Sequence, residues 1–388
     1  MPKAKALAAL AAALALALAL VSPAAASSKL QIGIYDEAET LFGDPDVTFP
    51  VLQRLRVKTL RVNLYWYRVA PFEPPEPANP ASIPYDWDLY DRTTLYAQQF
   101  GIRLVFSIFG TPDWANLGLG YNYAPDNMTA LRAFALAAAR RYSGRYRRED
   151  GIVLPKVDQW IAWNEPNQPT FLMPQWVQGF DGKYVAQSAR TYARMCNAIV
   201  SGVHAAGREV KVQETVACGV TSPRGNNIGG GSRPSVSPLV FLRELAKAGA
   251  KFDVYAHHPY AGSRLETPTT RPPARTAVSL GNIDALFTEL NRLYGRKMRV
   301  WITEYGYQTN PPDPLFGVSW RKQALFLTEG FVIARTHPRI DMMLWFLLQD
   351  EPDVAGWQSG LFTADGKKKP AFGAFQSLAT SFRLLRRR

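Results

Sequence analysis

The sequence predicts an α/β fold, a (β/α)8 TIM barrel, and three observations carry that prediction. Short runs rich in β-branched and aromatic residues alternate with longer amphipathic runs, and the alternation repeats eight times. Connections from helix to strand are brief, whereas those from strand to helix are long and rich in Pro, Gly, Ser and Asn. About 360 residues follow the amino-terminal apolar segment, a length that one barrel accommodates.

Each predicted strand is dense in Val, Ile, Leu and aromatic side chains, and a predicted helix separates it from the next strand. This order favours parallel pairing, because parallel strands need a long crossover between them. The predicted strands span residues 30–36, 59–66, 102–109, 157–164, 209–216, 252–258, 299–304 and 340–347. The predicted helices span residues 87–100, 128–142, 184–206 and 237–250, with others near 49–56, 280–295, 320–336 and 370–385.

The amino-terminal segment is typical of an export signal. Two lysines precede an almost uninterrupted run of Ala, Leu and Val over residues 6–21, and Ala24 and Ala26 then supply the small-residue pattern of a cleavage site. We therefore predict a signal peptide over residues 1–26, a single domain over residues 27–388, and a bacterial protein that is secreted or held in the cell envelope. The alternative is an uncleaved membrane anchor, because the apolar run approaches the length of a bilayer. No other run does, so we expect no membrane span after cleavage.

Composition argues against several classes of function. The net charge is +13, but the basic residues are scattered through helical segments, and no nucleic-acid-binding motif is present, so we expect no nucleic-acid partner. Four His and two Cys at unrelated spacings predict neither a metal site nor a cofactor. Cys196 and Cys218 are candidates for one disulfide in an exported protein, and the sequence leaves open whether they meet. We expect a monomer.

Two glutamates stand at the ends of the fourth and seventh predicted strands. Strand alternation puts Glu165 and Asn164 on opposite faces, so the chain must bend there if both side chains face one pocket. Glu304 shares a face with Val300 and Ile302, which we expect to fill the barrel below it. Since the fourth and seventh strands lie on opposite sides of an eight-strand ring, we expect the two carboxylates to face each other across its mouth.

Two opposed carboxylates over an accessible cleft are what the cleavage of a glycosidic bond requires. One protonates the leaving oxygen, and the other attacks or stabilises the anomeric carbon. The transition state is cationic at the sugar, so an ionised carboxylate stabilises it. The acid must stay protonated, and partly apolar surroundings with a like charge nearby achieve this by raising its pKa.

The segments "WNEPN" and "WITEYG", which contain the two glutamates, resemble the acid/base and nucleophile motifs of the retaining glycoside hydrolases of clan A. The resemblance is greatest to families 39 and 5 and covers about residues 30–385, including residues 110–116 and 359–372. It implies a double displacement in which Glu165 is the acid/base, Glu304 is the nucleophile, and no cofactor takes part.

The resemblance also implies partners for the nucleophile. Arg61 is similar to the second-strand Arg that keeps the nucleophile ionised, although it would also satisfy buried carboxylates in a purely structural role. His258 and Tyr260 are similar to the sixth-strand His-x-Tyr pair that contacts the nucleophile and the sugar. His257 points to the opposite face from its neighbour, so we assign His258 to the pocket and His257 to structure.

Further residues are candidates for contacts with the substrate. Asn164 can hydrogen-bond a sugar 2-hydroxyl, and Trp345 stands where the clan has a tryptophan that stacks on the substrate. Trp114 is a third candidate, because aromatic faces stack on sugar rings. Glu214, near the end of the fifth predicted strand, is a rival acid that we interpret as a polar pocket or core residue. Other aromatic residues line subsites or pack in the core: Tyr121, Trp176, Trp320 and Trp357.

The sequence thus predicts a secreted glycoside hydrolase that cleaves O-glycosidic bonds of a poly- or oligosaccharide with retention. The alternatives are a transglycosylase with the same residues, in which a sugar hydroxyl replaces water, and a non-catalytic carbohydrate-binding envelope protein. The basic charge balance points weakly to an anionic polymer, but an Arg-rich genome gives the same balance. The sugar, the linkage and exo or endo action depend on rim loops that vary freely on this fold.

Overall fold

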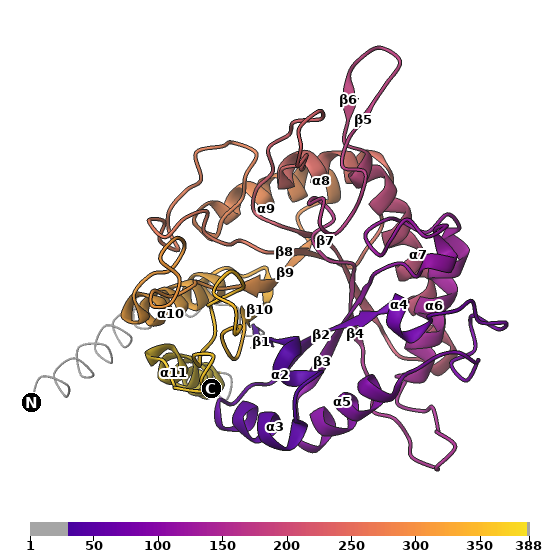
Figure 1. The fold of residues 1–388 in the computed structure, drawn as a ribbon, viewed down its shortest axis with the longest axis horizontal. Helices are drawn as coiled ribbons and strands as arrows, with labels where there is room; N and C mark the ends of the chain where they lie inside the picture. Colours follow the sequence, from indigo (N-terminus) through magenta and orange to yellow (C-terminus); the bar gives the residue numbers. More distant parts are fainter. Residues whose placement is uncertain (1–29, 386–388) are drawn as a thin grey trace, which may run out of the picture.

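The computed structural model describes residues 30–385, which form a ring of parallel strands surrounded by helices (Figure 1). The predicted signal peptide, residues 1–26, lies outside the described residues. Among the residues that are described, no helix is both long enough and apolar enough to cross a bilayer.

Eight strands close the barrel, and the predicted (β/α)8 TIM-barrel class is confirmed. The first strand pairs in parallel with the second and also with the last, so the barrel sheet has no free edge. The barrel strands are β1 (Gln31–Tyr35), β2 (Thr59–Tyr65), β3 (Arg103–Phe109), β4 (Gln159–Ala162), β7 (Thr215–Thr221), β8 (Val254–His257), β9 (Arg299–Tyr305) and β10 (Ile340–Phe346).

At least one helix follows each barrel strand. Standard local signals begin them: Asn127 accepts a hydrogen bond from Thr129 N at 2.8 Å and caps α6, and Pro238 opens α8. The helices are α2 (Glu37–Thr40), α3 (Pro45–Arg54), α4 (Trp66–Val69), α5 (Asp88–Gln99), α6 (Met128–Arg141), α7 (Gln187–Val210), α8 (Pro238–Lys247), α9 (Ile283–Tyr294), α10 (Trp320–Thr336) and α11 (Pro370–Leu385), with short 3-10 turns η1 (Asp113–Ala115) and η2 (Leu280–Asn282). A small hairpin, β5 (Val177–Gln178) and β6 (Tyr184–Val185), projects from the loop after β4 (Figure 1).

The fifth barrel strand lies further along the chain than predicted. Helix α7 runs on through Val210, which falls inside the strand predicted over residues 209–216, and Lys211 then ends the helix with a φ of 57°. The strand begins only at Thr215, so Glu214 lies before its start, at the end of the barrel opposite the mouth. There Glu214 accepts a hydrogen bond from Trp160 Nε1 at 2.9 Å, which removes it as a rival acid.

The inward and outward faces of β9 and β10 also differ from the prediction. Trp301 and Leu344 belong to a buried cluster made only of strand residues, which is the barrel interior. Val300 and Ile302 instead join the cluster between the strands and the helices, so the prediction that they fill the barrel was wrong. A register shift between β10 and β9 at the level of Glu304 then brings this side chain to the mouth.

One covalent link fastens a helix to the barrel wall. Cys196 on α7 and Cys218 on β7 form a disulfide, with their Cα atoms 6.2 Å apart. The sequence left this pairing open, because the position of β7 along the chain decides whether the two cysteines meet. The bond joins α7 to the strand that follows it.

Candidate active site

A cavity of about 520 Å³ lies at the carboxyl ends of the barrel strands, where a TIM barrel places its functional residues. Glu165 and Glu304 both line it, from opposite sides of the ring. Carboxylate oxygens of the two residues and a nitrogen of His258 all lie within 4.8 Å of one another. Seven aromatic residues also line the cavity: Tyr35, Tyr65, Phe109, Phe171, Tyr260, Phe346 and Trp357.

The end of β4 brings two adjacent side chains into this cavity. The strand stops at Ala162, and both Trp163 and Glu165 adopt positive φ angles, of 70° and 33°. Residues with a Cβ rarely adopt this region, so the backbone turns sharply instead of continuing the alternation of a strand. Asn164 and Glu165 therefore both line the cavity, by means of the bend that was predicted from the sequence if both faced one pocket.

Arg61 lies beneath the carboxylate of Glu304 and holds it in place. The guanidinium is fully buried, and its Nη1 donates to Glu304 Oε1 at 2.7 Å. Its Nη2 donates to Asn164 Oδ1, also at 2.7 Å. One cation thus links the two candidate catalytic segments, and the side-chain amide of Asn164 keeps its N–H donors for another acceptor.

The two carboxyl groups differ in what surrounds them. Burial raises the pKa of Glu304, but Arg61 opposes this rise, and so does Tyr260, whose hydroxyl donates to Oε2 at 2.9 Å. Burial raises the pKa of Glu165 well above its ordinary value, and the charge of Glu304 raises it further. The arrangement therefore favours a protonated Glu165 beside an ionised Glu304.

His258 bridges the two segments as a neutral side chain. Burial and the adjacent Arg61 hold its pKa well below the ordinary value. Its Nε2 lies 3.3 Å from Arg61 Nη1, which can only donate, so Nε2 is the acceptor and Nδ1 carries the proton. Nδ1 lies 2.9 Å from Glu165 Oε1 and can donate to it. His257 lies apart, between Thr221 Oγ1 at 2.9 Å and Val278 O at 3.0 Å.

Two predicted substrate contacts are corrected by the structure. Trp345 points away from the barrel interior, is fully buried, and donates through Nε1 to Ser359 O at 2.9 Å. Trp114 packs edge-on against Trp66, with ring centroids 5.6 Å apart, and donates to Ala70 O at 2.8 Å. Neither side chain lines the cavity.

The aromatic residues that do line the cavity include Phe346, the residue after the predicted Trp345, and Trp357. Their rings lie 5.2 Å apart, and Trp357 also contacts Tyr260 at 5.1 Å. Trp176 donates through Nε1 to Ser235 O at 3.2 Å, and Trp320 donates to Pro311 O at 3.0 Å. Of the four aromatic residues predicted to line subsites or pack in the core, Trp357 lines this cavity, and Tyr121, Trp176 and Trp320 do not.

The sequence reasoning missed a polar group at the ends of β1 and β2. Asn63 and Tyr65 line the cavity, and Glu37 holds both, accepting from Asn63 N at 2.8 Å and from the Tyr65 hydroxyl. Tyr35 lies under the guanidinium of Arg61, 4.3 Å from ring centroid to Cζ. The sequence could have indicated these residues, because they lie at or just after the carboxyl ends of predicted strands. The same criterion had selected the two glutamates.

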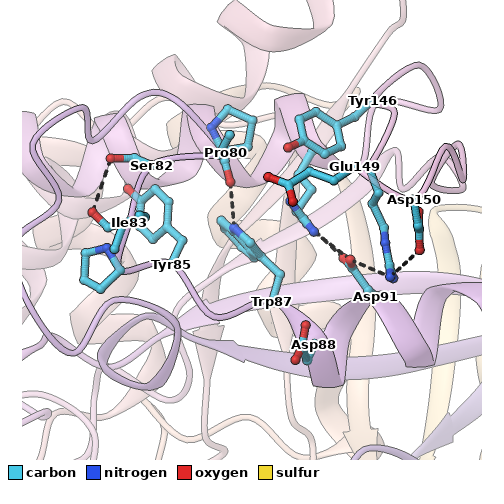
Figure 2. Close-up of a pocket in the computed structure, with 14 residues that line it drawn as sticks. Pro80, Ser82, Ile83, Tyr85, Trp87, Asp88, Asp91, Tyr146, Glu149 and Asp150 are labelled. Carbon is cyan, nitrogen blue, oxygen red and sulfur yellow. Dashed lines mark hydrogen bonds and ion pairs between the residues drawn. The ribbon is translucent and has the colours of Figure 1, made fainter.

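A second cavity, of about 580 Å³, lies between the start of α5 and the segment after α6 (Figure 2). Its two arginines are paired with Asp91, which accepts two hydrogen bonds from Arg141, at 2.9 and 2.6 Å, and one from Arg148 at 3.3 Å. This network fastens the segment after α6 to α5. We therefore place the candidate active site at the strand ends and not here.

No protein family model matches the chain, and no curated protein matches it. Solved structures do match. A family 39 glycoside hydrolase from Bacteroides cellulosilyticus WH2 is 18% identical, with a TM-score of 0.63 over 93% of this chain. The match covers 65% of that protein, so this chain spans less than two thirds of its length.

Two further structures are 14% identical. A glucosidase from Croceicoccus marinus has a TM-score of 0.60 over 92% of this chain and 68% of its own. A GH5_18 protein from Bifidobacterium longum subsp. longum, in complex with Manb1-4GlcNAc, has a TM-score of 0.59 over 91% of this chain and 78% of its own. The chain therefore has the TIM-barrel fold that is found in family 39 and GH5_18 glycoside hydrolases.

Proposed function

We propose that the protein is a retaining glycoside hydrolase that acts on a poly- or oligosaccharide. The observation that carries the proposal is the approach of Glu165 and Glu304 to within 4.8 Å between carboxylate oxygens, over a cavity at the strand ends. Retaining enzymes hold their carboxyl groups about 5–5.5 Å apart, whereas inverting enzymes need about 6.5–9.5 Å to admit a water molecule. The separation supports retention.

In the first step Glu304 attacks the anomeric carbon and forms an ester bond, while the bond to the leaving oxygen breaks. Glu165 donates its proton to that oxygen. Arg61 and Tyr260 each hydrogen-bond one oxygen of Glu304, which fixes the carboxylate for attack. The free donors of Asn164 suit the 2-hydroxyl of the reacting sugar.

In the second step the same acid acts as a base. Once Glu304 is esterified its negative charge is gone, and with it one of the causes that raise the pKa of Glu165. Glu165 then remains ionised, aided by the hydrogen bond from His258 Nδ1, and accepts a proton from the attacking water. Water opens the ester and releases the sugar with its original anomeric configuration.

We also propose that the protein is exported through the signal peptide at residues 1–26. The disulfide between Cys196 and Cys218 supports this, because such bonds persist in oxidising compartments. Amino-terminal sequencing of the protein from the native host should begin at Ser27. An intact amino terminus would favour the membrane anchor.

Incubation of the purified protein with a panel of aryl glycosides, disaccharides and polysaccharides tests the proposal. The wild type should release sugar with the anomeric configuration retained in the first product, as followed by NMR. Glu165→Gln should lose about 10²- to 10⁴-fold in rate on unactivated substrates. An inverted first product, or normal turnover by Glu304→Gln, would contradict it. Sugar binding without turnover would favour the carbohydrate-binding alternative, and products longer than the substrate would favour a transglycosylase.

A further inference from the structure

We propose that Arg224 determines specificity for the leaving group, by donating hydrogen bonds to the sugar that departs. The inference rests on the proposed function, because it assigns a role within the same cavity. Arg224 lies in the loop after β7, whereas the two candidate catalytic glutamates lie at the ends of β4 and β9, and it lines the cavity that holds both of them.

The place of Arg224 relative to the leaving sugar follows from the position of the acid. A general acid lies beside the leaving oxygen, so the departing sugar must lie along Glu165 and the loop that continues from it. Gln168, on that loop, donates through Nε2 to Arg224 O and to Ser222 Oγ, both at 2.6 Å. Asn167 donates to Ser222 Oγ at 3.0 Å. These bonds fasten the Arg224 segment to the acid side of the cavity.

The guanidinium of Arg224 is held from two sides. Its Nη2 donates to Glu266 Oε2 at 2.6 Å, and the same oxygen accepts from Gly262 N at 2.9 Å. The guanidinium also lies directly against Gly262, where a Cβ would come within 2.1 Å of Arg224 Cζ. The absence of a side chain at position 262 is what lets the guanidinium occupy this place, so it is positioned before any ligand arrives.

Most donors of this guanidinium have no protein acceptor. Within residues 30–385 the side chain donates to Glu266 alone, and its Nε is buried without a partner. About a third of the side chain, 34%, is exposed. Arginine offers five N–H donors in a rigid fork and no acceptor, so the group that it suits is rich in oxygen acceptors. On the acid side of the cavity that group is a hydroxyl or a carboxylate of the leaving sugar.

The test compares two substrates that carry the same reacting sugar, taken from those that the wild type cleaves. One is the phenyl glycoside, whose leaving group has neither hydroxyl nor carboxylate, and the other is the disaccharide. Arg224→Gln should lower kcat/KM for the disaccharide by about 10- to 100-fold, and for the phenyl glycoside by less than about threefold. Gly262→Ala should give the same selective loss without removing a charge, because the new Cβ displaces the guanidinium.

Arg264→Gln is the matched control, since Arg264 is an exposed arginine on the same rim loop as Gly262. It should change neither rate. Equal losses of Arg224→Gln on both substrates, or no loss on the disaccharide, would overturn the proposal. Disaccharides with a neutral hexose or a hexuronic acid in the leaving position distinguish a hydroxyl from a carboxylate as the acceptor. A selective loss of kcat/KM in either series supports the proposal. A selective loss in neither series overturns it. A wild type that cleaves no glycoside would instead refute the proposed function itself.

Discussion

Replacing Tyr260 by Phe removes one hydroxyl and leaves the ring in place. That hydroxyl donates to Glu304 Oε2 at 2.9 Å, and the ring is held by Trp357, at 5.1 Å between centroids. A hydrogen bond to a charged group is worth about 1.5–3 kcal/mol. Its loss removes a cause that lowers the pKa of Glu304, so the ionised nucleophile forms only at higher pH in the variant. The acid limb of kcat/KM should therefore move to higher pH.

The size of the effect is measured at pH values below the pKa of the acid limb, where kcat/KM is proportional to the ionised fraction of Glu304. A loss of about 1.5–3 kcal/mol corresponds there to a rate about 10- to 150-fold below that of the wild type, with a smaller difference on the plateau. The assay is kcat/KM on one aryl glycoside from about pH 3 to pH 9. Tyr65→Phe is the control, because the Tyr65 hydroxyl donates to Glu37. An acid limb that stays in place in Tyr260→Phe would refute the role assigned to this hydroxyl.

Three further changes probe other parts of the molecule. Asp91→Asn leaves the buried Arg141 without its counter-charge, while Arg148 keeps its ion pair with Asp150, and it should cost about 3–5 kcal/mol of unfolding free energy, measured by denaturant titration. Replacing Cys196 and Cys218 together by Ser opens a loop of 22 residues and should cost about 3 kcal/mol in the same measurement. Trp357→Ala should raise KM at least about tenfold, whereas Trp114→Phe, outside the cavity, should leave KM within about twofold. Equal effects of the two tryptophan variants would contradict the placement of the site.

The fold followed from the sequence because local signals repeat in every unit. A strand of β-branched residues, a long loop and an amphipathic helix recur eight times, and only a closed parallel barrel gives each strand two neighbours. The exception was β7, where the helical pattern and the strand pattern overlap. Val210 fits both, and the packing of α7 decided in favour of the helix.

The site was predicted best where chemistry limits the choice of residue. Glu165 and Glu304 stand out because a carboxylate at the end of an apolar strand has few other uses. Alternation along β10 separates Trp345 from Phe346, but it does not say which of the two faces points into the barrel; the structure shows that Met342 and Leu344 point inward and that Phe346 lines the cavity. The side chain of Arg224 gave no signal in the sequence, because its position depends on Glu266 and on the missing side chain at Gly262.

The central claim is that Glu304 becomes covalently bonded to the sugar. Incubation with a 2-deoxy-2-fluoro glycoside, which slows release of a glycosyl-enzyme, followed by peptide mass spectrometry, tests this directly. We expect the added mass of one fluorosugar on the peptide that carries "WITEYG", at Glu304, and none in Glu304→Gln. A label on another carboxylate, or turnover of the natural substrate that leaves no residue labelled, would contradict the account.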